Sequence, residues 1–226
     1  MSLPSFKSDV EATDEPNQED GKVRSYPHER GQWTTHVHAS LSEESVERLR
    51  EVLGDALIDS SPGALRNIRA LDDFHVSLFR GHCVLRFHHI PLVVNALTQS
   101  LAKLSSFTVV LNFVQILTND ENTRKFISVC DRRSQEESSG QVQQIMKTID
   151  KTLRQFVDLK EYSDATILHS SLLWFSPNSV EESHLTDVTS KLQEEFDDEP
   201  IIEKIDSVAL KIGKQLYNIP LGGDTK

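Results

Sequence analysis

Two His-x-Ser tripeptides, each inside a run of apolar residues, constrain this chain more than any other feature of its sequence. They are His75-Val76-Ser77 in the run 74–79 and His169-Ser170-Ser171 in the run 167–175. Short apolar runs of this kind are typical of buried β-strands. Alternate side chains of a strand share a face, so each histidine and the serine two residues later should project from the same side. The fold must therefore present a His/Ser pair on two separate strands.

The elements around the two tripeptides follow one another in a similar order twice. Besides the tripeptide strands, strands are expected at 33–39, 107–117, 125–130, 205–210 and 215–219, and helices behind Ser40 or Ser42 and over 83–104, 142–156 and 180–196. Pro91 should separate a short turn from the helix behind it, and 211–214 is expected to be a hairpin turn. This order predicts an α+β fold with two lobes, each of which presents its tripeptide to a shared cleft.

The length and the charge pattern predict one folded body with tails. A chain of 226 residues is long enough for one large domain or for two small lobes that share a core. Residues 1–22 are polar and acidic, and we expect them to be a disordered tail. The body should span 23–221, and 222–226 should be a short C-terminal tail.

Composition argues against several classes of protein. Neither a secretory signal nor an apolar run of about 18 residues is present, so we expect a soluble intracellular protein. The two cysteines, Cys83 and Cys130, form no CxxC or zinc-binding spacing, which favours a reducing compartment. A net charge of −11 argues against a protein that coats nucleic acid through a long basic surface. It does not argue against an enzyme that holds only a strand end.

Two histidines with neighbouring hydroxyl groups can cleave a phosphodiester without a metal ion or a cofactor. Histidine has an unperturbed pKa of about 6.5, so it can give or take a proton near neutrality. One neutral imidazole can take the proton of a ribose 2′-hydroxyl, which attacks phosphorus, while the other protonates the departing 5′-oxygen. The serine hydroxyls can donate hydrogen bonds to the non-bridging oxygens. This scheme needs RNA and yields a 2′,3′-cyclic phosphate, and it leaves open which histidine is the base.

The remaining histidines allow a metal alternative. A single His-x-Ser tripeptide is commonly structural, whereas two in comparable strands leave a catalytic role and a structural role equally open. His36 and His38 alternate on a strand, and His88 and His89 are adjacent on an expected helix. Adjacent helical positions do not share a face, and no carboxylate spacing completes a ligand set, so we expect no metal. His36 and His38 should lie on a strand surface or line the cleft.

A few aromatic and basic residues have two possible roles. Tyr26 and Trp33 can stack on bases or can pack against the core. Lys211 and Lys214 can meet phosphates or can simply be solvated.

The paired H-x-S tripeptides resemble the signature of the 2H phosphoesterase superfamily. Other stretches resemble one of its branches, the U6 small nuclear RNA phosphodiesterase family. They are 24–33 (RSYPHERGQW), 35–37 (THV), 74–78 (FHVSL), 117–119 (LTN), 123–124 (TR), 126–127 (FI), 211–214 (KIGK) and 219–221 (IPL). The likeness covers 23–221, and PHERGxW is its most specific part. It implies a two-lobed fold with pseudo-twofold symmetry, in which antiparallel sheets flank a central cleft.

This resemblance implies a 3′-to-5′ exoribonuclease that trims the oligouridine tail of U6 small nuclear RNA in the nucleus. Its product would end in a cyclic phosphate or, after ring opening, a phosphate. The implied partner is the 3′ end of a single-stranded RNA, with no metal, cofactor or membrane, and we expect a monomer.

By the same resemblance, His75 and His169 match the catalytic histidines, and Ser77 and Ser171 match the hydroxyls that contact phosphate. Further substrate-binding residues are expected at Val76, Ser170, Tyr162 and Asn119. Tyr162 matches an aromatic residue that stacks on a base. Two other functions remain open: another 2H enzyme acting on cyclic phosphates or RNA ends, and a module that binds RNA ends without cleaving them.

Overall fold

The computed structural model describes residues 31–58, 67–79, 83–135, 140–159 and 167–222. The acidic tail expected at 1–22 and the predicted site residue Tyr162 lie outside these ranges. In the part of the chain that is described, no helix is both long and apolar enough to cross a membrane.

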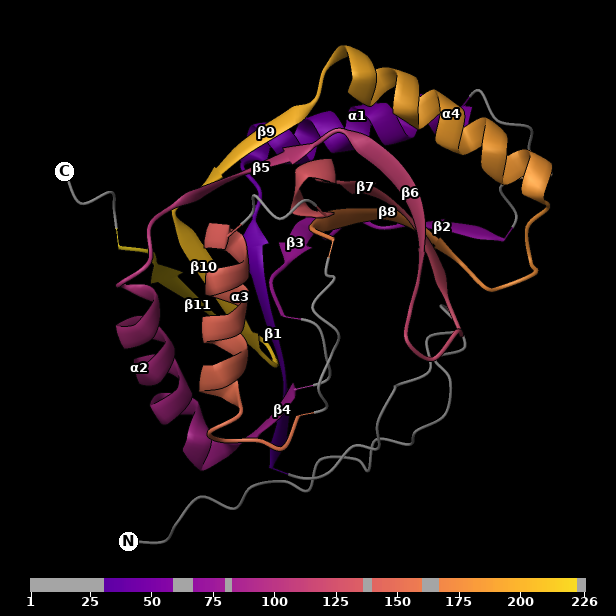
Figure 1. Cartoon of the computed structure of the whole chain (residues 1–226). Helices are drawn as coiled ribbons and strands as arrows, with labels where there is room; N and C mark the ends of the chain where they lie inside the picture. The colour runs from indigo at the N-terminus through magenta and orange to yellow at the C-terminus, as the bar shows by residue number, and fades with distance from the viewer. Residues whose placement is uncertain (1–30, 59–66, 80–82, 136–139, 160–166, 223–226) are drawn as a thin grey trace, which may run out of the picture.

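The first sheet carries the first tripeptide. Its strands are β1 (Gln32–Ser40), β3 (His75–Ser77), β4 (Cys83–Arg86), β10 (Ser207–Ile212) and β11 (Gln215–Pro220). Strands β11, β10, β1 and β3 follow in that order, β4 pairs with another part of β1, and all these pairs are antiparallel. Helices α2 (Ile90–Leu101) and α3 (Gly140–Leu153) pack together, and α2 contacts β11 (Figure 1).

The second sheet carries the second tripeptide. Its order is β2 (Ile68–Ala70), β8 (His169–Phe175), β7 (Lys125–Cys130) and β6 (Phe113–Thr118), again antiparallel throughout. Helices α1 (Glu43–Ile58) and α4 (Glu182–Asp198) pack against each other, and α4 contacts β6 (Figure 1). A small sheet pairs β5 (Phe107–Leu111) with β9 (Ile201–Ile205). The predicted α+β fold with antiparallel sheets is confirmed.

The segment Cys83–Arg86 differs from the prediction, because it forms strand β4 rather than the start of a helix. Cys83 and Leu85 are buried, and they lie opposite Thr35 and Trp33 of β1. This edge pairing outweighs the apolar helical spacing, which begins to hold only after the 3₁₀ turn Phe87–His89. Pro91 then lies in the first turn of α2, where a proline costs no hydrogen bond.

The closing strands also differ from the prediction, since three are present instead of two. Ile201–Ile205 pairs with β5, and the expected hairpin forms from β10 and β11. Gly213 has a φ of 55° in the turn, and a Cβ atom there would lie 2.8 Å from Cε3 of Trp33. Trp33 therefore packs against a turn that only glycine fits.

Helix α1 starts where one of the two expected caps stands. The Oγ atom of Ser42 accepts a hydrogen bond from the main-chain N–H of Ser45 at 3.2 Å. Glu203 on β9 accepts three more at one carboxylate oxygen, from the N–H and hydroxyl of Ser42 and the hydroxyl of Ser45. A short strand that the sequence did not indicate thus anchors the N-terminus of α1.

Candidate active site

Both tripeptides are strands with the expected alternation of side chains. His75 and Ser77 of β3 are partly exposed, whereas Val76 between them is fully buried. In β8, His169 and Ser171 are partly exposed and Ser170 is fully buried. The two strands contact each other where the two sheets meet (Figure 1). The fold thus brings the two histidine strands together.

The neighbouring strands repeat the same register. On the first sheet, His38 of β1 lies opposite Ser77, and Ser40 lies opposite His75. On the second sheet, Ser128 of β7 lies opposite Ser171, and Cys130 lies opposite His169. Each tripeptide therefore has an antiparallel neighbour with an equivalent pairing, as a pseudo-twofold arrangement requires.

The two candidate catalytic histidines, His75 and His169, each make the same kind of hydrogen bond. Nδ1 of His75 lies 2.8 Å from the main-chain oxygen of Asp73, and Nδ1 of His169 lies 2.8 Å from that of Ile167. Because a carbonyl oxygen only accepts, each Nδ1 carries a hydrogen and the neutral ring has its lone pair on Nε2. Each imidazole is therefore oriented for proton transfer at Nε2.

The serines have different partners in the two lobes. The Oγ atom of Ser77 lies 3.1 Å from Nε2 of His36, while that of Ser171 lies 3.2 Å from the Oγ atom of Ser128. The sequence predicts His36 on a strand surface or in the cleft, and the structure places it beside Ser77 and His75. Ser128 was not predicted, although it carries the only hydroxyl group on the expected strand 125–130.

Three imidazole rings cluster in the first lobe. The ring centroids of His36, His38 and His75 are 4.9–5.1 Å apart. Burial lowers the pKa of His36 and of His38 to about 4, and the charge of protonated His75 adds to the effect. Both rings are therefore neutral at pH 7, where they can accept or donate single hydrogen bonds without adding positive charge.

A carboxylate and an ammonium group act on His75 in opposite directions. Burial lowers the pKa of His75, the Asp73 carboxylate raises it, and Lys211 lowers it. The Nζ atom of Lys211 lies 3.3 Å from Oδ2 of Asp73, whose Oδ1 is 3.9 Å from Nδ1 of His75. For Asp73 itself, burial raises the pKa, but His75 and Lys211 outweigh it and the net pKa is lowered. The second lobe has Ile167 in the place of Asp73.

The other predicted substrate-binding residues do not join the histidines through side-chain contacts described here. The side chains of Val76 and Ser170 are fully buried, and the two residues lie opposite Ala39 and Val129 of the neighbouring strands. The Ser170 hydroxyl has no hydrogen-bond partner among the described residues. Asn119 organises the loop between β6 and β7, where Oδ1 accepts the N–H groups of Thr123 and Arg124. Tyr162 lies outside the described residues.

The described residues contain no group of three or more His, Cys, Asp or Glu side chains that is arranged to hold a metal ion. His88 and His89 contact each other at a centroid distance of 4.2 Å, and His89 lies beside Phe156. They do not join the ring cluster of His36, His38 and His75.

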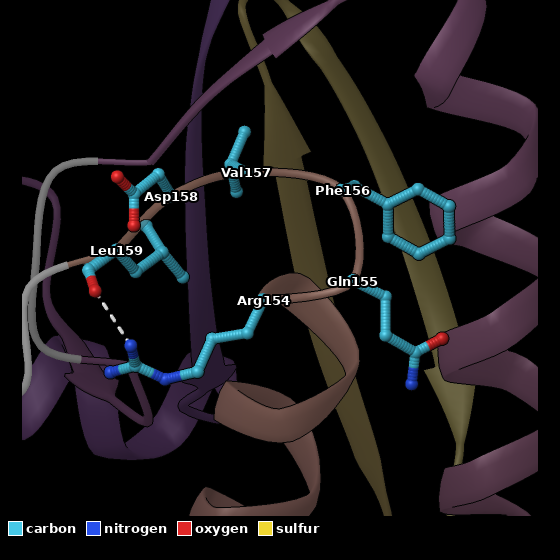
Figure 2. Close-up of a pocket in the computed structure, with 6 residues that line it drawn as sticks. All are labelled: Arg154, Gln155, Phe156, Val157, Asp158 and Leu159. Carbon is cyan, nitrogen blue, oxygen red and sulfur yellow. Dashed lines mark hydrogen bonds between the residues drawn. The ribbon is translucent and has the colours of Figure 1, made fainter.

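A pocket of about 370 Å³ lies at the end of α3 and is separate from the predicted site residues. It is lined by residues 154–159, and Figure 2 shows Arg154 reaching across to the main-chain oxygen of Leu159, at 2.6 Å. A second hollow, of about 390 Å³, lies along α3. Neither is lined by a histidine or serine of the tripeptides.

Comparison with known proteins finds relatives that carry one and the same name. The model of the HVSL family, described as an uncharacterised conserved protein, matches residues 1–220, and 75–78 of this chain spell those four letters. U6 snRNA phosphodiesterase 1 of Mus musculus is 31% identical over 207 residues, covering 89% of this chain and 73% of the mouse protein. The Drosophila melanogaster protein of the same name is 29% identical over 218 residues, covering 96% and 80%.

Solved structures share the fold. The chain matches Kluyveromyces marxianus Usb1 with a TM-score of 0.54 at 14% identity, covering 84% of this chain and 98% of Usb1. It matches Escherichia coli LigT in its apo form with a TM-score of 0.51 at 10% identity, covering 84% and 95%. The chain thus shares its overall fold with Usb1 and LigT.

Proposed function

Because this chain belongs to the U6 snRNA phosphodiesterase family, we propose that it shortens the 3′ end of U6 small nuclear RNA, acting in the nucleus as a monomer. The relatives that carry this name support the substrate. The Kluyveromyces marxianus Usb1 structure with uridine monophosphate supports a uridine end. The folded body proposed for this activity is 23–221.

The observation that carries the proposal is the matched pair of histidines. His75 and His169 lie on contacting strands, each held through Nδ1 by a carbonyl oxygen two residues earlier. One ring takes the proton of the 2′-hydroxyl as the bond from O2′ to phosphorus forms. The other donates its proton to the 5′-oxygen as that oxygen leaves phosphorus. The shortened RNA then ends in a 2′,3′-cyclic phosphate, and attack by water opens it to a phosphate.

The two serines serve the phosphoryl group. Ser77 and Ser171 share a strand face with the histidine two residues before them, so their hydroxyls can donate hydrogen bonds to the non-bridging oxygens. The partners His36 and Ser128 orient these hydroxyls. Val76 and Ser170 contribute main-chain atoms, Tyr162 stacks on a base, and Asn119 presents the β6–β7 loop to the nucleotide. These steps use protein groups alone, without a metal or a cofactor.

The activity is tested with an RNA that ends in uridines, incubated with the full-length protein in EDTA and resolved by length. Stepwise loss of 3′ nucleotides is expected, and it should disappear in His75→Ala and in His169→Ala. RNA that is bound but not shortened would identify a binding module instead. Activity on a small cyclic phosphate, without activity on the tailed RNA, would identify another 2H enzyme.

The nucleophile is tested separately by removing it from the substrate. An RNA with 2′-deoxyribose at the penultimate position lacks the attacking hydroxyl, so the last nucleotide should not be removed. Release of that nucleotide at the normal rate would contradict attack by O2′.

A further inference from the structure

A β-bulge in β8 changes which side chains lie on the face of His169 and Ser171. Up to Ser171, β8 pairs in regular register with β7. The register then shifts by one residue, so that Leu173 lies opposite Ile127 and Trp174 lies opposite Phe126. Bulges re-aim side chains and are common beside active sites.

The shift places Trp174, and not Leu173, on the site face. Ser128 faces the site because its hydroxyl contacts that of Ser171, and Phe126 shares this face because it lies two residues before Ser128 on a regular strand. Trp174 pairs with Phe126 and therefore projects from the same side. The residues Leu172, Leu173 and Ile127 are fully buried, as expected of the opposite face.

Two arginines flank this tryptophan. The guanidinium carbon of Arg124 lies 5.1 Å from the centre of the Trp174 ring, and Arg69 of β2 is the direct cross-strand partner of Trp174 on its other side. Arg69 is exposed, and Trp174, Phe126 and Arg124 are partly exposed. We call these four residues the Trp174 platform.

The chemistry of the Trp174 platform suits an anionic aromatic ligand. An indole ring can stack on any nucleobase, and guanidinium groups can pair with phosphates. Two cations beside two aromatic rings stand out on a chain with a net charge of −11. The platform begins about 7–10 Å along β8 from Ser171, within reach of a nucleotide next to the one being cleaved.

We propose that the Trp174 platform is a second nucleotide-binding subsite, which stacks a base of the RNA strand held at His75 and His169 and neutralises its phosphate through Arg69 and Arg124. This inference rests on the proposed function, because it assumes that the ligand at the histidines is RNA. It adds a contact outside both tripeptides, on the strand that carries the second one.

The two tryptophans of the chain make the platform directly observable. Trp33 and Trp174 are the only two present, so Trp33→Phe leaves Trp174 as the single indole fluorophore. An oligouridine RNA with 2′-deoxyribose at the penultimate position serves as the uncleaved probe. Its titration should quench the emission of the Trp33→Phe protein and leave that of the Trp174→Phe protein unchanged. Quenching in the Trp174→Phe protein alone would overturn the inference in favour of Trp33.

Kinetics on a cleavable oligouridine RNA provide the second measurement. Trp174→Leu should raise KM by about 5-fold or more, the loss expected for one stacked base. Arg69→Gln should raise KM and also reduce the slope of log KM against log salt concentration by about 0.7, because one phosphate contact is lost. Phe87→Leu, at an aromatic residue that is 71% exposed on the other lobe, is the matched control and should change neither quantity.

The outcomes separate the subsite from the proposed function. Arg69 is exposed on the three-residue edge strand β2, so its replacement tests the subsite even if Trp174→Leu lowers the melting temperature. Suppose that the protein trims RNA, that Arg69→Gln leaves KM and the salt slope unchanged, and that Trp174 is not quenched. The Trp174 platform would then only pack the β6–β7 hairpin, and the subsite would be ruled out. A wild-type protein that neither binds nor trims RNA would overturn the proposed function itself.

Discussion

The Nε2 atom of His36 lies 3.1 Å from the Oγ atom of Ser77, so a histidine in the first lobe fills the role that a hydroxyl fills in the second. The equivalent partner of Ser171 is Ser128, at 3.2 Å. Because burial lowers the pKa of His36 to about 4, its ring is neutral when the enzyme works near pH 7. The contact therefore orients the Ser77 hydroxyl without placing a second positive charge beside His75.

Replacing His36 should separate orientation from chemistry. His36→Leu removes the partner of Ser77 and should lower kcat by about 2- to 10-fold, the effect of one hydrogen bond of ordinary strength. His36→Gln retains groups that can bond the hydroxyl and should recover most of the loss. The measurement is single-turnover trimming of a uridine-tailed RNA. Equal losses in the two variants, at unchanged melting temperature, would contradict an orienting role.

Asp73 and Lys211 should shift the pH profile in opposite directions. The Asp73 carboxylate raises the pKa of His75 and Lys211 lowers it. Asp73→Asn should therefore move the limb of the kcat/KM profile that reports His75 to lower pH, and Lys211→Met should move it to higher pH. Since the Asp73 side chain is 70% exposed, water screens its charge, and both shifts should be small.

This direction holds whether His75 acts as the acid or as the base, because only its pKa is changed. Lys214→Met, at an exposed lysine of the same hairpin turn, is the control and should leave the profile in place. Shifts of the same sign in Asp73→Asn and Lys211→Met would rule out a direct charge effect on His75.

Glu203 should affect stability and not catalysis. One carboxylate oxygen accepts hydrogen bonds from the N–H and hydroxyl of Ser42 and from the hydroxyl of Ser45, at 2.6–3.1 Å. Glu203→Ala leaves the start of α1 without its acceptor and should reduce the free energy of unfolding by about 1–3 kcal/mol. Urea unfolding at pH 7 measures the change. Glu194→Ala, at an exposed position of α4, should reduce the free energy of unfolding much less. The value of kcat/KM should be unchanged in both variants.

The two thiols should be unreactive in the folded protein. Cys83 and Cys130 are 2% and 0% exposed, and burial raises the pKa of each to about 12. Since the thiolate is the reactive form, iodoacetamide at pH 8 should label neither cysteine until urea unfolds the chain. Mass spectrometry of the treated protein gives the number of labelled cysteines. Rapid labelling of Cys130 in the native protein would show that the second sheet opens at β7.

The sequence by itself determined the local features of this protein. Period-two alternation placed each histidine and its serine on one strand face, and apolar spacing located helices α1 to α4, because both signals depend only on residues close in the chain. The resemblance of the tripeptides and of PHERGxW to a known family indicated the same fold that the structure shows. Val76 and Ser170 were expected to bind substrate, and the structure buries both of their side chains.

Only the tertiary structure decided the contacts between distant segments. Pairing with β1 turned Cys83–Arg86 into a strand, and β9 brought Glu203 to the start of α1. Register with β7 brought Ser128 to Ser171, and the bulge beyond it exchanged Leu173 for Trp174 on the site face. A bulge and a register depend on the partner strand and on which apolar side chains the core can bury, and a single stretch of sequence does not contain that partner.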